Sequence, residues 1–417
     1  MAGNIVIMIP LIPLEKRPMY QGFFGAVFGV SSVLGPLVGG AFTNNSRLTW
    51  RWCFYINLPI GAVAILLLIL FLRLPPLPKS ELTATEKFKR MDPLGNLVFT
   101  PSIVSLLLAL QWGGSTYAWN NARVVALLVL AAVLFAVWVV IQAYGGENAT
   151  VPPRVFLQRS IVCAMAFALC VSGSMLVFAY YMAIWFQAVG GVDALQSGIR
   201  TLPFILALVV AAIFSGGLIS RLGYYSPIVI ASACVLSVGS GLLTTLRPDS
   251  GSDRWIGFQF LAGFGTGLGM QIPSIAAQVV LKAADVPIGA SLMFFAQGLG
   301  GAVFLCVAQN VFIQELLRRL SATLPAASAQ LLASVGATDF RALVPAEQLP
   351  AALEAYNGAV TTTFLVAVST AAFSVIPALG FEWRSVKEKK DATKAQKEQE
   401  TGGGGEEREK GRESMGV

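Results

Sequence analysis

Charged residues are segregated along this chain in a pattern that is typical of membrane proteins. Only 12% of the residues are charged, against about 25% in soluble domains. A soluble helix keeps a polar face toward water, whereas about 20 consecutive apolar residues cross the hydrocarbon core of a bilayer. Ten windows of 20 residues or more contain no Asp, Glu, Lys or Arg: 19–46, 52–72, 93–122, 124–146, 160–192, 201–220, 222–246, 255–281, 286–314 and 355–381. The sequence therefore predicts an all-α polytopic membrane protein with about ten complete transmembrane helices.

Residues 1–14 form a further apolar run, which is too short to cross a membrane. Fourteen helical residues reach about 21 Å, less than the ~30 Å of a hydrocarbon core. No basic residue precedes this run and no clear cleavage site follows it, so a signal peptide is disfavoured. We interpret the run as the last part of a membrane span.

Composition excludes several classes of function. The chain has no histidine, which excludes His-based acid–base chemistry and His metal sites. Its five cysteines contain no C-x-x-C pair, so neither a metal site nor a disulfide framework is expected. No Asp or Glu lies inside any of the ten windows, which argues against a membrane enzyme. The tail from Glu382 holds nine basic and nine acidic residues, so the net charge of +7 arises in short loops and does not indicate a nucleic-acid partner.

Basic residues are unequally divided between the two sets of alternate loops. They divide 11 to 6 when the tail and the 314–355 loop are left out. The positive-inside rule places the richer set, which includes the 73–92 loop and Arg221, in the cytoplasm. The charged tail then lies on the cytoplasmic side as well.

The window at 19–42 carries its small residues on one side of the expected helix. Seven residues fall within a stripe of roughly 100° on a helix: Gly22, Gly25, Gly29, Ser32, Pro36, Gly39 and Gly40. A glycine stripe lets a second helix approach closely. One interpretation is a simple packing face, which many membrane helices have.

A second interpretation comes from the sequence motifs in and after this stripe. Gly35-Pro36-Leu37-Val38-Gly39-Gly40, preceded by Gly25 and Gly29 and followed by WRWCFYINLPIG at 50–61, resembles the antiporter motif of the major facilitator superfamily. More narrowly, it resembles the fifth span of the fourteen-spanner drug:proton antiporters, as in fungal toxin and multidrug efflux pumps. The motif residues in this chain would be Gly25, Gly29, Gly35, Pro36, Gly39 and Gly40.

The resemblance implies a fold, a function and an energy source. The fold would be that of a major facilitator lacking roughly the first three to four spans. The function would be the efflux of small amphipathic drugs, toxins or secondary metabolites by proton antiport through alternating access. No cofactor is expected, only a proton gradient, and the protein would work as a monomer in the bilayer. The plasma membrane is the default location for the family, with the vacuolar membrane as the alternative.

A second short segment of the chain resembles another motif of the superfamily. Residues 216–223 match the loop G-x-L-x-D-R-x-G at Gly216, Leu218, Arg221 and Gly223, with Ser220 in place of the acid. The loss of the acid puts a charge relay at this turn in doubt. Arg221 serves equally well as a topology anchor in the alternative interpretation.

The charge pattern and the resemblance together divide the chain into four parts. Residues 1–72 would be the remnant of an N-terminal bundle, with the end of span four and spans five and six. Residues 73–159 would hold two linker spans with cytoplasmic loops. Residues 160–381 would form a C-terminal six-helix bundle, and 382–417 a disordered charged tail.

Uncharged polar residues inside the windows are the candidates for a substrate path. In a continuous helix over 256–280, Gln271 and Gln278 share a roughly 80° arc with Gly263 and Gly267. Either the glutamines face a cavity, which we favour for Gln271, or the stripe packs on a neighbour, which we favour for Gln278. Trp185 is interpreted as part of an interfacial aromatic belt. The further path candidates are Tyr181, Gln187, Gln297 and Asn310.

One alternative to an active pump follows from the same resemblance. The chain would then be a truncated, transport-incompetent fragment that has lost its proton-handling spans. The upstream genomic sequence distinguishes the two, because in-frame exons encoding about four more apolar segments would mark a truncated gene product.

Overall fold

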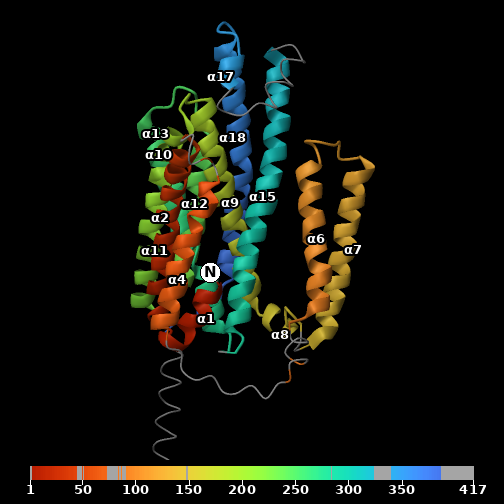
Figure 1. Cartoon of the computed structure of the whole chain (residues 1–417), viewed down its shortest axis with the longest axis vertical. Helices are drawn as coiled ribbons and strands as arrows, with labels where there is room; N and C mark the ends of the chain where they lie inside the picture. The colour runs from red at the N-terminus through yellow and green to blue at the C-terminus, as the bar shows by residue number, and fades with distance from the viewer. Residues whose placement is uncertain are drawn as a thin grey trace, which may run out of the picture.

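The chain folds into long, roughly parallel helices (Figure 1). The computed structural model describes residues 2–44, 49, 51–72, 83, 86, 91–146, 149–282, 284–323 and 340–386, so most of the predicted tail lies outside the described residues. The helices are α1 (Ala2–Leu11), α2 (Arg17–Asn44), α3 (Trp52–Tyr55), α4 (Asn57–Phe71), α6 (Pro93–Trp112), α7 (Ala122–Gly145), α8 (Pro153–Phe156), α9 (Arg159–Ala188), α10 (Ala194–Arg200), α11 (Leu202–Leu222), α12 (Ser226–Leu243), α13 (Ser252–Gly269), α14 (Ile272–Val280), α15 (Val286–Thr323), α17 (Phe340–Leu343), α18 (Leu349–Phe373) and α19 (Val375–Gly380).

The helices account for all ten apolar windows, which confirms the all-α polytopic prediction. Eight segments of the described chain are helical, long and apolar enough to cross a membrane. The other two windows are helical as well: α2 covers the first, and α13 together with α14 covers the one at 255–281.

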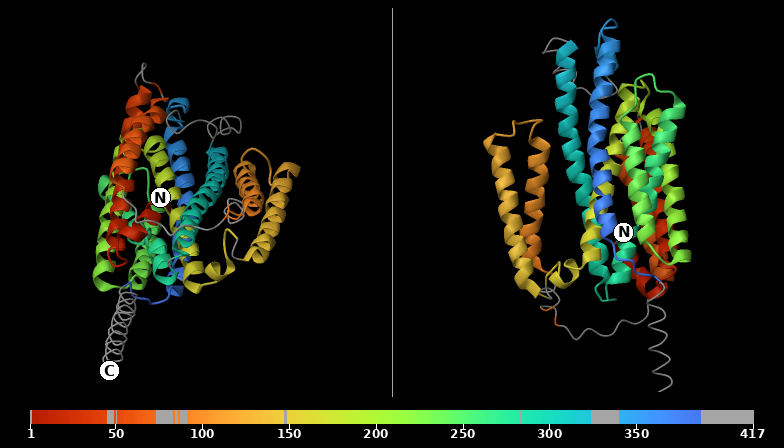
Figure 2. Two further views of the ribbon diagram at one scale, coloured as in Figure 1. Left: turned by 60° about the horizontal axis from the view of Figure 1, so that its bottom comes forward. Right: turned by 180° about the vertical axis from the view of Figure 1, so that it is seen from behind.

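Packing gathers most of the helices into one bundle, with a hairpin at its side. Helix α11 contacts α2 on one flank and α13 on another, while α15 packs against α9 and α18. Helices α6 and α7 pair with each other and reach the bundle through α15, so the two predicted linker spans stand as a separate hairpin in Figures 1 and 2.

Asp92 secures the end of this hairpin at which α6 begins. Its carboxylate caps α6 by accepting from Gly95 N at 2.9 Å, and it also accepts from Gln142 Nε2 at 2.6 Å and Thr150 Oγ1 at 2.9 Å. Burial disfavours the charged carboxylate, but the hydrogen bonds outweigh burial and lower the pKa of Asp92. The hairpin and the start of the following loop are therefore held together by one ionised side chain.

Arg154 joins the same loop region to the bundle. Its guanidinium binds the carboxylate of Asp285, just before α15, through two contacts at 2.7 and 2.9 Å. Asp285 is nearly buried whereas Arg154 is half-exposed. Bidentate pairing of this kind fixes orientation as well as distance, so α8 is tied to the start of α15.

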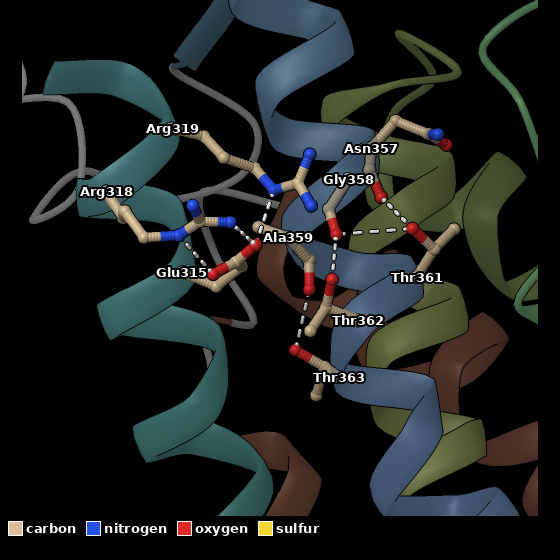
Figure 3. Close-up of polar contacts among 9 residues, drawn as sticks. All are labelled: Glu315, Arg318, Arg319, Asn357, Gly358, Ala359, Thr361, Thr362 and Thr363. Atoms are coloured by element: carbon tan, nitrogen blue, oxygen red, sulfur yellow. Dashed lines mark hydrogen bonds and ion pairs between the residues drawn. The ribbon is translucent and has the colours of Figure 1, made fainter. Parts of the chain in front are cut away.

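Near the C-terminal end of α15 and the N-terminal end of α18, charged and hydroxyl groups of the two helices have local partners (Figure 3). Glu315 pairs with Arg318 at 2.6 Å and with Arg319 at 2.7 Å. A β-carbon at Gly358 would overlap the Arg319 guanidinium, so this glycine lets the two helices approach. The hydroxyls of three consecutive threonines in α18 bond to carbonyls of their own helix: Thr361, Thr362 and Thr363. The cluster is accounted for as a structural one.

Candidate functional site

The glycine flank of α2 lies directly against α11. A β-carbon at Gly22 would stand 2.9 Å from the carbonyl oxygen of Ala212, and one at Gly25 would stand 2.9 Å from Ala212 Cβ. One at Gly29 would overlap Val209 Cγ2. Only glycine fits at such an approach, so this half of the stripe forms a helix–helix contact surface.

The other half of the stripe has different surroundings. Around Gly35, no atom that would meet an added β-carbon lies within 4 Å, and Gly39 meets only Cys53 Sγ at 3.9 Å. Pro36 and Gly40 lie within α2, which runs through both positions as one helix. The stripe is therefore not one uniform packing face, because the glycines from Gly22 to Gly29 contact α11 while Gly35 does not.

A cavity opens where α2, α9, α10 and α11 converge. Its volume is about 350 Å³, within the range of small-molecule sites. Two sequence-predicted residues, Gly29 and Gln187, are in its wall. The described residues that line it are Gly29, Met175, Leu176, Phe178, Ala179, Ala183, Gln187, Ala194, Ser197, Gly198, Thr201, Phe204, Ile205 and Leu208.

The cavity wall combines an aromatic pair with a small polar group. The rings of Phe178 and Phe204 are tilted by 43° with centroids 4.5 Å apart. Ser197 donates to Ala183 O at 2.8 Å, and Thr201 donates to Gly198 O at 2.7 Å. Both hydroxyl protons are thus used by the backbone, and each oxygen keeps acceptor capacity. The site can bury an apolar ring and accept hydrogen bonds at one edge.

Sequence reasoning missed the other lining residues, among them Phe178, Ser197, Thr201 and Phe204. The available signal was the short polar segment between two apolar windows, which forms α10 after Asp193 caps its first turn at Gln196 N, 2.7 Å away. Which face of α9 would meet α10 and α11 could not be read from the spacing of apolar residues, because both windows are apolar all round.

The continuous helix predicted over 256–280 is wrong. Helix α13 ends at Gly269 and α14 begins at Ile272, with Gln271 at the N-cap position. Pro273 has no amide proton to donate to Gly269 O, which interrupts the hydrogen-bond ladder at this point. Gly263 and Gly267 pack against the backbone of α11, where β-carbons would overlap the carbonyls of Phe204 and Leu208.

Two substrate-path candidates meet at this break. Gln297 Nε2 donates to Met270 O at 3.0 Å, so this side chain from α15 satisfies a carbonyl at the interruption. Gln271 Nε2 lies 3.8 Å from the β-carbon position of Gly25, which brings Gln271 to the glycine flank of α2. Gln278 is buried and donates to Ser274 O at 3.1 Å, within its own helix.

The remaining path candidates lie away from the cavity. Tyr181 is only 1% exposed and packs against Phe312, ring centroids 5.3 Å apart, in the core between α9 and α15. Asn310 Nδ2 donates to Leu110 O at 2.7 Å and so joins α15 to the α6–α7 hairpin. Neither side chain lines the cavity described above, and their roles in substrate binding stay predictions.

The interpretation of Trp185 as part of an interfacial belt is wrong. Its side chain is buried and donates from Nε1 to Asn357 Oδ1 at 2.7 Å. Asn357 Nδ2 in turn donates to Leu246 O at 3.0 Å, which links three helix ends through one buried amide. The signal for this partner was Asn357 itself, an amide near the N-terminal end of the apolar window at 355–381.

The turn at 216–223 is built on two glycines with different tasks. Gly223 ends α11 with φ of 85°, a left-handed conformation that favours glycine. A β-carbon at Gly216 would overlap Pro18 O, so this residue admits the start of α2. Gly223 O also accepts from Val386 N at 2.8 Å, which places the segment after α19 beside the turn. Arg221 is exposed in the last turn of α11.

Comparison with known protein families agrees with this architecture. The Major Facilitator Superfamily profile matches residues 1–305. The chain belongs to the major facilitator superfamily. No group of three or more His, Cys, Asp or Glu side chains that could hold a metal ion occurs among its described residues.

The chain is also similar to fungal transporters along nearly its whole length. It is 48% identical to the rubrofusarin-specific efflux pump aurT of Gibberella zeae, over 93% of this chain and 70% of the relative. It is 45% identical to efflux pump aflT of Aspergillus parasiticus, over 93% and 75%, and 44% identical to efflux pump roqT of Penicillium rubens, over 94% and 72%. These relatives are named as transporters rather than enzymes, and the chain is a membrane-spanning protein of the same superfamily.

Proposed function

We propose that this chain is a secondary active efflux transporter that exports small amphipathic compounds by proton antiport. The observation that carries the proposal is that the glycine contact between α2 and α11 lies directly beside a cavity of ligand size. Gly29 of α2 belongs both to the glycine contact with α11 and to the wall of the 350 Å³ cavity. A movement of α2 along α11 would therefore change the cavity directly.

Alternating access requires two helical bodies that shift around a central site. Interlocking side chains resist such a shift, whereas Gly22 and Gly25 present no side chain to Ala212 of α11. The relatives named as efflux pumps favour this function over a transport-incompetent fragment. The plasma membrane is the proposed location, and we expect the protein to act as a monomer.

Accumulation of a fluorescent apolar compound tests the proposal. The complete protein would be expressed in a host strain that lacks its own efflux pumps, with expression checked by immunoblot. We expect lower accumulation than in the empty-vector strain, and we expect a protonophore to abolish the difference because it collapses the proton gradient. Unchanged accumulation over a broad panel of neutral and charged compounds would contradict the proposal.

A further inference from the structure

We infer that the cavity at α2, α9, α10 and α11 takes uncharged, flat aromatic compounds and rejects organic cations. This inference rests on the proposed function, because it names the class of cargo for the same site. It is argued from the charge of the wall, the shape of its apolar part and the chemistry of its polar edge.

Among the described residues that line the cavity, none has a charged side chain. The polar side chains that line it are those of Gln187, Ser197 and Thr201. A cation that leaves water for such a site loses its hydration and gains no counter-charge, which is the most costly kind of burial. An uncharged compound of the same shape does not incur that cost.

The charged residues of the neighbouring α10 segment do not change this balance. Asp193 accepts from Gln196 N at 2.7 Å at the start of α10, and the Arg200 guanidinium lies 5.9 Å from the centre of the Phe186 ring. They have opposite signs, and neither they nor Phe186 line the cavity. Charge near the site is therefore balanced rather than negative.

The apolar part of the wall suits a flat ring. Phe178 and Phe204 form a tilted pair 4.5 Å apart that meets the cavity only at its edges, since the two residues are 2% and 4% exposed, and Met175, Ile205 and Leu208 extend the same apolar surface. Aromatic side chains favour offset or edge-to-face contact with a further ring. A phenyl ring can also attract a cation, but this attraction is weaker than that between a cation and a carboxylate, and it does not replace the hydration that the cation loses.

The polar edge favours a donor on the cargo. Since Thr201 directs its proton to Gly198 O, its half-buried oxygen can serve a ligand only as an acceptor, whereas Ser197 donates to Ala183 O and is only 1% exposed. A phenolic or alcoholic hydroxyl supplies the matching donor without a charge. The preferred cargo is thus a flat ring system with a hydroxyl at one edge.

A matched pair of fluorescent compounds tests the inference. The two would share one ring system and one hydroxyl, and one of them would also carry a quaternary ammonium group. In the accumulation assay we expect the uncharged compound to be exported about tenfold more efficiently than the cation, relative to the empty-vector strain. Equal or better export of the cation would overturn the inference and leave the efflux function standing, whereas export of neither compound would overturn both.

Two variants with matched controls test the cavity itself. Gln187→Glu places an acid in the wall and should raise cation export several-fold, whereas Gln196→Glu adds the same charge at an exposed position of α10 and should not. Phe204→Leu should reduce export of the uncharged compound, whereas Phe214→Leu, on the exposed face of the same helix, should not. No gain of cation export in Gln187→Glu, at normal expression and surface level, would overturn the inference.

Discussion

Alanine substitutions at Gly22 and Gly35 separate packing from helix propensity within one helix. Both residues belong to α2, and both substitutions add a single methyl group. A β-carbon at Gly22 would stand 2.9 Å from Ala212 O and 3.3 Å from Ile213 Cα, both backbone atoms of α11. At Gly35 no such atom lies within 4 Å. We expect Gly22→Ala to be less stable than Gly35→Ala.

The size of the difference follows from these contacts. Carbon and carbonyl oxygen ordinarily approach to about 3.3–3.6 Å, so the methyl group at Gly22 forces α2 and α11 apart by about 0.4 Å or more. Overpacking of this kind costs about 1–3 kcal/mol. Alanine is the better helix former by about 1 kcal/mol, but this gain applies to both variants and cancels. The free energies of unfolding should therefore differ by about 1–3 kcal/mol.

Thermal unfolding in lipid nanodiscs measures this difference. A thiol-reactive dye can follow exposure of the five cysteines, and all proteins should be heated at the same rate because unfolding of membrane proteins is commonly irreversible. The apparent Tm of Gly22→Ala should lie a few degrees below that of Gly35→Ala, while Gly35→Ala should match or exceed the parent chain. Equal apparent Tm values, or a lower value for Gly35→Ala, would show that α2 does not rest on α11 at Gly22.

Three further substitutions have the same unfolding assay as readout. Asp92→Asn should lower the free energy of unfolding by about 1–3 kcal/mol. Folding lowers the pKa of Asp92 below its ordinary value of 3.8, so the stability that the ionised carboxylate contributes is full above that pH and is lost as pH falls through the folded pKa. The variant should lack this pH-dependent loss of stability. Arg154→Glu should destabilise by about 1–2 kcal/mol, discounted for the exposure of the arginine, and Asp285→Arg added to it should restore part of the loss. Gly223→Ala should cost about 1–2 kcal/mol because φ is 85° there, whereas Gly217→Ala should be neutral; equal effects of the two glycine substitutions would contradict this.

The transmembrane helices were predictable because their cause is local. A window such as 124–146 holds no charge, and its backbone groups must bond within the segment when no water is present. The segment therefore forms α7 whatever its neighbours are. The close contact at Gly22 and Gly25 was likewise within reach, since a bare helix flank has few uses besides the approach of another helix.

The parts that the sequence did not reveal depend on rotation about helix axes. Trp185 and Gln187 are two residues apart on α9, yet one is buried against Asn357 and the other lines the cavity. In helices that are apolar all round, the hydrophobic pattern carries no information about which face turns inward. The helix break at Gln271 is different, because Pro273 was a visible signal for it in the sequence. The prediction missed the break because it assumed one continuous helix.

Helix α11 lies between two glycine surfaces, and their chemistry indicates which of them can slide. On one flank, Gly263 and Gly267 of α13 meet the carbonyls of Phe204 and Leu208. That flank is also tied by Ser215 Oγ, which donates to Leu268 O at 2.7 Å. On the α2 flank, Gly22, Gly25 and Gly29 meet carbon and carbonyl atoms of α11. Glycine has no side chain that could donate a hydrogen bond to these atoms.

A displacement along the α13 flank would break a buried hydrogen bond and leave a carbonyl unpaired within the membrane, which is costly. A displacement along the α2 flank exchanges one van der Waals contact for another. The α2–α11 surface is therefore the one at which a rocking motion costs least. Because Gly29 belongs both to that surface and to the cavity wall, the same displacement would open or close the cavity.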